Sequence, residues 1–167
     1  FQRNRMTPLV LTGGETYIRN CNFTENNATG LAGGAIRARS GTLRVTDTKF
    51  DSNHAGTGGA IHQEFPTMDT RMERVTMNAN TAEEYGGAIN LVDGYLRLSN
   101  ESALMHNLAG PGSAFGNQIY RQRGRLTYVL PAPLAHWISD EVSCTWYRTP
   151  CPASNASCVQ SAQPFVP

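Results

Sequence analysis

The sequence has few charged residues and no long uninterrupted apolar run. Charged residues make up 16% of the 167 positions, and 14 Lys and Arg against 13 Asp and Glu leave a net charge of +1. This balance gives no electrostatic basis for binding nucleic acid or an anionic membrane, so we expect neither partner. The most apolar stretch, 128–138, is interrupted by Pro131, Pro133 and His136. We therefore predict no membrane insertion.

Sustained helical periodicity is also missing. No window keeps apolar residues at positions i, i+3 and i+4, whereas 16 Gly and 9 Pro indicate short strands and tight turns. The best helical candidate, 80–85, is about one turn long before Gly86 and Gly87 end it. The length suits one domain. The chain begins at Phe1 without an initiating Met, which predicts a processed chain or a segment of a longer one.

An internal repeat organises the region 23–115. Four boxes of the form F-x-x-N-x-A, with Met or Leu at the first place of the later copies, recur at a constant step of 27 residues. Their first residues are Phe23, Phe50, Met77 and Leu104, and their asparagines are Asn26, Asn53, Asn80 and Asn107. A box reading G-G-A-I follows at 33–36, 58–61 and 86–89, with a degenerate copy at 112–115, at steps of 25, 28 and 26. A third apolar patch precedes each asparagine box, so each repeat offers three short strands.

Three strands in about 27 residues cannot bury a hydrophobic face alone, so successive repeats must stack. We predict an all-β fold: a right-handed parallel β-helix of about four to five coils over 1–125, each coil rising about 4.8 Å. The region 126–167 is predicted to be an irregular, disulfide-containing tail, rich in Pro and Cys, that caps or connects the helix.

Stacking turns each repeated position into a column. The first residues of the asparagine boxes are expected to form one apolar column inside the helix, and Ile36, Ile61, Ile89 and Phe115 another. The four asparagines should form a ladder in which each amide bonds to the next coil and to backbone groups of the turn. Such columns specify architecture and carry no reactive groups.

The joint recurrence of F-x-x-N and G-G-A-I over 23–115 resembles the polymorphic membrane protein repeats of chlamydiae and related β-helical surface proteins of microbes. The resemblance implies a surface-exposed passenger with a role in adhesion or envelope structure. The tail, with 130–133 reading L-P-A-P, Trp137 and the cysteines that follow, resembles the segment after such repeats in large surface proteins of unicellular algae and protists.

Four cysteines, Cys21, Cys144, Cys151 and Cys158, allow two disulfides in three connectivities. Their spacing suggests one bridge within the last three and a second that joins Cys21 to the remaining one; alternatively, Cys21 is a buried thiol in the slot shared with Thr48 and Val75. No C-x-x-C pair is present, so we expect no metal and no cofactor. N-x-[ST] sequons occur at Asn22, Asn27, Asn100 and Asn155. They predict N-linked glycans on an extracellular protein, secreted or at the cell surface.

Parallel β-helices also include polysaccharide lyases and hydrolases, which need clustered carboxylates. The richest local set is Asp47, Asp51 and His54, with Glu83 and Glu84 near the next turn, and no acidic column aligns at the repeat step. Arg121, Arg123 and Arg125 form a basic run that could bind an acidic glycan, although alternation on an exposed strand explains it equally well.

We therefore expect a structural or adhesive glycoprotein module, not an enzyme, that belongs to a surface filament or cell-envelope assembly. Its partners would be further copies arranged head to tail, other surface proteins, or glycans. A carbohydrate-active β-helix enzyme or a glycan-binding module is the alternative.

Overall fold

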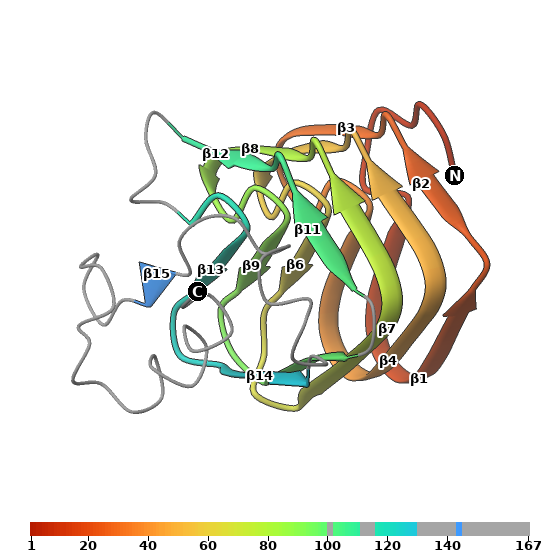
Figure 1. Ribbon diagram of the computed structural model, residues 1–167, viewed down its shortest axis with the longest axis vertical. Coiled ribbons are helices and arrows are strands. Elements are labelled where there is room, and N and C mark those ends of the chain that lie inside the picture. Colours follow the sequence, from red (N-terminus) through yellow and green to blue (C-terminus); the bar gives the residue numbers. More distant parts are fainter. Residues whose placement is uncertain (100–101, 111–115, 130–142, 145–167) are drawn as a thin grey trace.

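The computed structural model describes residues 1–99, 102–110, 116–129 and 143–144, and every regular element in these residues is a β-strand. The strands wind into a parallel β-solenoid of about four turns, whose coils lie side by side along the molecule (Figure 1). The predicted parallel β-helix is therefore confirmed. No helix in this part of the chain could cross a bilayer.

The strands repeat in the same order from coil to coil. The first coil contains β1 (Leu9–Arg19), β2 (Asn22–Thr24) and β3 (Asn27–Ala32), and the second contains β4 (Ile36–Asp51) and β5 (His54–Thr57). The third contains β6 (Ile61–Gln63), β7 (Met68–Asn78) and β8 (Thr81–Tyr85). The fourth contains β9 (Ile89–Leu91), β10 (Tyr95–Ser99), β11 (Ala103–Met105) and β12 (Leu108–Ala109). A further turn starts with β13 (Ile119–Arg121) and β14 (Arg125–Val129), and β15 (Ser143–Cys144) pairs with β13.

Further strands begin at the last two residues of each asparagine box and, in the first three copies, continue toward the glycine box; the prediction did not assign a strand here. These segments form a separate sheet with the order β12-β8-β5-β3. Asn27 lies opposite His54 at the step of 27, whereas Ala32 lies opposite Thr57 after a register shift. The linker of variable length is therefore a strand that starts in register and loses it before the glycine corner.

The interior is filled by the repeated apolar positions. One column contains Phe23, Phe50, Met77 and Leu104, each at most 1% exposed. A second contains Ile36, Ile61, Ile89 and Ile119, also at most 1% exposed. Burying each such side chain contributes roughly 1.5–3 kcal/mol. Because the members of each column lie opposite one another on successive coils, the core is continuous through the stack.

The fourth member of the isoleucine column is Ile119, and the prediction of Phe115 at this place was wrong. Ile119 pairs with Ile89, and Gly116, with a φ of 69°, replaces the first glycine of the box. The degenerate box at 112–115 lies outside the described residues. The connection between Asn107 and this corner is longer than in the earlier coils, so a search at a similar step selects residues that come too early.

Two further boundaries differ from the sequence-based expectation. The predicted helical turn at 80–85 is strand β8, because its pairing with β5 and β12 replaces local helical hydrogen bonds. Strand β14 pairs with β10 and buries Leu126 to 5% exposure, so the last described strand of the solenoid crosses the expected boundary after residue 125.

Two of the corners of each coil are built in different ways. At the asparagine corner, the residue before the Asn has a positive φ without being glycine: Glu25 (54°), Ser52 (55°), Ala79 (52°) and His106 (54°). At the glycine corner, the first glycine of the box has the positive φ: Gly33, Gly58, Gly86 and Gly116. The second glycine lies against the next coil, since a Cβ at Gly59 would lie 2.1 Å from the carbonyl oxygen of Gly87.

Candidate functional site

Phe1 to Asn4 form an additional F-x-x-N rung that the constant step of 27 does not find. The Phe1 ring stacks on Phe23 with a centroid distance of 4.8 Å, and Phe23 stacks on Phe50 at 4.9 Å. Arg3 has a φ of 54°, as Glu25 does at the same place of the next coil. Residues 1–4 read F-Q-R-N and so match the motif, but Phe1 precedes Phe23 by only 22 residues. A search at the repeat step of 27 therefore does not find this copy.

The asparagines form a ladder through the interior of the solenoid. The amide nitrogens Nδ2 of Asn26, Asn53 and Asn80 each donate to the Oδ1 of the following asparagine, at 2.8, 2.9 and 2.9 Å. The same oxygens accept the backbone N–H of the preceding asparagine at 2.9–3.1 Å. The Nδ2 of Asn53 also donates to the carbonyl oxygen of Phe23 at 2.9 Å. Each buried amide thus satisfies turn groups in the coils on both sides.

The hydrogen bonds of the ladder all run in one direction. Asn4 donates through its backbone N–H and its Nδ2 to the Oδ1 of Asn26, at 3.1 and 2.7 Å, as the later rungs do. Within the described residues, the Oδ1 of Asn4 accepts no hydrogen bond. At the other end, Asn107 donates to the Oε1 of Gln118 at 2.5 Å, and the buried Nε2 of Gln118 has no partner in the described chain. Among the described residues, the ladder therefore has an acceptor without a donor at one side and a buried donor without an acceptor at the other.

The N-terminal end of the solenoid is also an exposed strand edge. Strand β1 pairs with β4 only, so its outer edge faces no strand of the described chain. Large apolar side chains concentrate here: five of the eight that the described residues expose belong to the first coil, namely Phe1, Met6, Val10, Tyr17 and Leu31. An unpaired edge beside apolar surface is a template for pairing with another chain.

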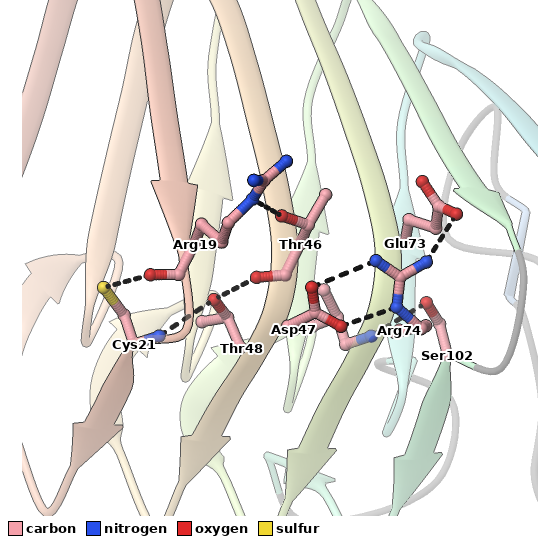
Figure 2. A network of polar contacts seen from close by, with 9 residues as sticks. Arg19, Cys21, Thr46, Asp47, Thr48, Glu73, Arg74 and Ser102 are labelled. Atoms are coloured by element: carbon pink, nitrogen blue, oxygen red, sulfur yellow. Dashed lines mark hydrogen bonds and ion pairs between the residues drawn. The ribbon is translucent and has the colours of Figure 1, made fainter.

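Figure 2 shows a polar network on the outside of the corner that precedes the F-x-x-N boxes. Arg74 binds both oxygens of Asp47, at 2.5 and 3.0 Å, and also Glu73 at 2.7 Å. The hydrogen bond from Arg74 lowers the pKa of Asp47 below its ordinary value. This effect outweighs desolvation, which acts in the opposite direction. Asp47 and Arg74 occupy equivalent places in successive coils and both have positive φ, 50° and 52°. The pair therefore links two coils at a strained corner.

The residues considered for catalysis do not converge. Asp47 is held by Arg74, and Asp51 accepts a hydrogen bond from Asn78 at 2.8 Å. His54 lies 2.8 Å from the Oγ1 of Thr81 through Nδ1, and 3.4 Å from Glu83 through Nε2. Each of these contacts joins a side chain to the next coil. In the described parts of the chain, no three His, Cys, Asp or Glu side chains are grouped so that they could hold a metal ion.

His62, which the sequence does not single out, is a buried histidine whose pKa is strongly lowered. It is 8% exposed, and its Nδ1 lies 2.9 Å from the Oγ1 of Thr57 and 3.2 Å from the Nδ2 of Asn90. Its Nε2 lies 3.8 Å from Glu64, which also pairs with Arg37. Burial lowers the pKa of His62 to about 4, so the ring is neutral near pH 7 and accepts at Nδ1.

The basic run at 121–125 does not form one exposed face. Arg121 ends β13 and is 9% exposed, whereas Arg123 lies between the strands and is 3.8 Å from Asp93. Arg125 begins β14 and faces outward. Neither of the two explanations offered for the run applies to it as a unit, because a corner separates its members.

The cysteines and sequons are only partly within the described residues. Cys21 is a half-buried free thiol whose Sγ lies 3.3 Å from the carbonyl oxygen of Arg19, in the slot that Thr48 occupies one coil later (Figure 2). Cys144 lies in β15, and Cys151 and Cys158 lie outside the described residues, so the disulfides stay a prediction. The sequons at Asn100 and Asn155 also lie outside them, whereas Asn22 and Asn27 are exposed.

Comparison of the chain with protein-family models, with curated proteins and with solved structures finds no match in any of the three. The resemblance to chlamydial surface proteins therefore rests on the repeat motifs, and the resemblance to algal and protist surface proteins rests on the tail.

Proposed function

We propose that the chain is a structural or adhesive module of an extracellular surface assembly, and that it associates head to tail with further copies through the N-terminal end of its solenoid. The observation that carries the proposal is the unfinished rung at this end. Phe1 is 58% exposed, and the Oδ1 of Asn4 lacks the donor that every other ladder oxygen has in the described chain. A further coil stacked here, from another copy or from residues that precede Phe1 in a longer chain, would supply both contacts.

The direction of the ladder favours head-to-tail contact. A head-to-head dimer would bring two Asn4 oxygens together, and two acceptors cannot bond to each other. A copy that presents the opposite end of the ladder instead brings donors, because the amide hydrogen bonds of the ladder all run in one direction. Contacts of this heterologous kind leave a free end after each addition, so they build an open filament.

The extracellular location is part of the same proposal. The exposed sequons Asn22 and Asn27 and the four cysteines support it, because N-glycans and disulfides are formed in secreted proteins. On this reading, any glycans lie on the outer faces of the coils and leave the ends available for stacking.

Light scattering on eluting chromatography fractions, with negative-stain images of the same fractions, tests the association. We expect species of two and more chains at high concentration, and their loss in Asn4→Lys, because a charged side chain cannot be buried between coils. Thr42→Lys adds the same charge on an outer face in the second coil and should leave the masses unchanged. Compact monomers at every concentration would contradict the proposal.

A further inference from the structure

One outer face of the solenoid carries a column of arginines. Arg44 on β4 lies in register with Arg71 on β7, and Arg71 lies in register with Arg97 on β10. Adjacent strands are about 4.8 Å apart, so three guanidinium groups follow the solenoid axis at that interval. Arg125 on β14 adds a fourth in the adjoining column, opposite Tyr95. This sheet runs along the lower side of the view in Figure 1, through β4, β7 and β14.

The charge of this column is largely uncompensated. Arg71 pairs with Asp69 of its own strand at 3.0 Å. Within the described chain, the side chains of Arg44, Arg97 and Arg125 make no ion pair or hydrogen bond. The nearest further carboxylate on the same strands, Glu73, is engaged by Arg74 at 2.7 Å. The two columns between β4 and β14 thus present four guanidinium groups against the single carboxylate of Asp69.

Such an arrangement does not serve the fold. Like charges that face each other on neighbouring strands oppose strand pairing, so the column costs stability unless anions neutralise it. Of the 14 basic residues of the chain, 13 are Arg. The planar guanidinium group of Arg can bind a carboxylate or a sulfate with two parallel hydrogen bonds. The face therefore has the chemistry of an anion site that repeats along a line.

A pocket lies at the end of the column. It measures about 310 Å³ and is lined by Tyr95, Arg97, Arg125 and Thr127. The Tyr95 side chain is 47% exposed, so its ring can lie against the C–H face of a sugar, while the Thr127 hydroxyl can donate to a ring substituent. Two cations, an aromatic ring and a hydroxyl around one hollow favour a charged carbohydrate over a simple ion.

We propose that this face binds a linear acidic polysaccharide, with a carboxylate or sulfate on successive sugars, whose chain runs along the solenoid axis over Arg44, Arg71 and Arg97 into the pocket at Tyr95. One charge per sugar ring matches one arginine per coil. In duplex DNA, each strand carries a phosphate about every 3.4 Å of the helix axis, which does not match the coil spacing of about 4.8 Å. The site does not depend on the self-association proposed above, because it lies on an outer face.

Binding to immobilised polygalacturonate and dextran sulfate tests the site, with neutral dextran and a duplex DNA oligonucleotide as comparisons. Arg44→Gln/Arg97→Gln should weaken binding to both polyanions about tenfold and reduce its salt dependence. The matched control Arg5→Gln/Arg123→Gln removes the same charge elsewhere and should change binding by less than about twofold. The thermal unfolding midpoint of Arg44→Gln/Arg97→Gln should be unchanged or raised, which separates a binding role from a structural one.

Three results would overturn the proposal. Equal losses in the two double variants would mean that only net charge matters. Tighter binding to the DNA than to either polysaccharide would assign the face to nucleic acid. Undiminished binding of the polyanions to Arg44→Gln/Arg97→Gln would place their site elsewhere.

Discussion

The asparagine corner and the glycine corner of each coil both turn the chain, but by different means. At the asparagine corner, a buried side-chain amide satisfies the turn, and the residue with positive φ varies among Glu25, Ser52, Ala79 and His106. At the glycine corner, backbone groups bond to the next coil directly, as Gly34 N–H does to Gly58 at 3.1 Å. The first corner needs one particular side chain, and the second needs the absence of one.

The two corners also differ in their spacing. The asparagines of the four boxes meet at a constant step of 27, whereas in the shorter first coil Asn4 meets Asn26 after 22 residues. Glycine backbone contacts require close approach but no fixed number of residues before the corner. The sheet formed by β3, β5, β8 and β12 absorbs the variation through its register shifts.

The largest effect is expected where the glycine corner is filled. In Gly59→Ala, the new Cβ would lie 2.1 Å from the carbonyl oxygen of Gly87 and 2.5 Å from that of Thr81, so the coils must separate. We expect a loss of more than about 4 kcal/mol in the free energy of unfolding, measured by urea titration. Gly30→Ala is the control. Gly30 has a positive φ, but a Cβ added there would have no atom within 4 Å. A loss in Gly59→Ala no greater than in Gly30→Ala would refute the close approach.

Removing one rung tests the asparagine corner. Asn53→Ala removes the hydrogen bonds that the backbone N–H of Asn26 and the carbonyl oxygen of Phe23 make to the Asn53 amide. Buried groups left unpaired cost about 1–3 kcal/mol each, so we expect a loss of about 3 to 4 kcal/mol in the free energy of unfolding. The partly exposed Asn78, which bonds to Asp51 on the outer face, provides the comparison. Asn78→Ala should cost less than about 1 kcal/mol, and equal losses in the two variants would argue against a structural ladder.

The glycine corner leads directly into buried His62, which makes that side of the coil sensitive to acid. The folded pKa of about 4 is below the unfolded value of about 6.5. Between these values the unfolded chain binds more protons, so stability is lost as pH falls from about 6.5 to 4. The difference amounts to at most about 3 kcal/mol. Urea titrations at pH 7 and pH 4 should show it.

The charged groups around His62 are Glu64, Arg37 and, through Glu64, Arg39. His62→Asn removes the imidazole and keeps these neighbours, so it should flatten the stability profile in this window. If the variant and the parent chain lose the same stability between pH 7 and pH 4, burial of the histidine is not the cause.

The smallest effect concerns the positive φ of the residue before the asparagine at the asparagine corner. Ala79 has a φ of 52°, a conformation that costs a residue with a Cβ about 1–2 kcal/mol. Ala79→Gly removes this strain but adds backbone freedom to the unfolded chain, so we expect a net gain of about 1 kcal/mol in stability. A rise of a few degrees in the thermal midpoint would show it. A lower midpoint would mean that the methyl group contributes packing that outweighs the strain.

Much of the fold could be predicted because the same physical need recurs in every coil. The constant step of Phe23, Phe50, Met77 and Leu104 is visible in the sequence, and their stacking follows from it. Ile119 could not be assigned by period, because a longer connection precedes its corner. The rung at Phe1 was missed for the opposite reason, since its coil is shorter by five residues.

The surface groups were harder to predict than the core. Asp47 and Arg74 occupy equivalent positions of successive repeats and have opposite charge. The repeat step places them in one column, but it does not show that their side chains bond to each other. The arginine column was hidden, because Arg97 follows Arg71 by 26 residues while Arg71 follows Arg44 by 27. Burial of His62 depends on neighbouring coils, and no local pattern reports it.

Hydrogen exchange of backbone amides at low and high protein concentration tests the proposed association most directly. We predict that raising the concentration slows exchange in 1–4 and along β1, whose outer edge is unpaired in the single chain. Exchange in the central strands β4 and β7 should not change, because both of their edges are already paired. Concentration-independent exchange at β1, or protection confined to other strands, would contradict stacking at the N-terminal end.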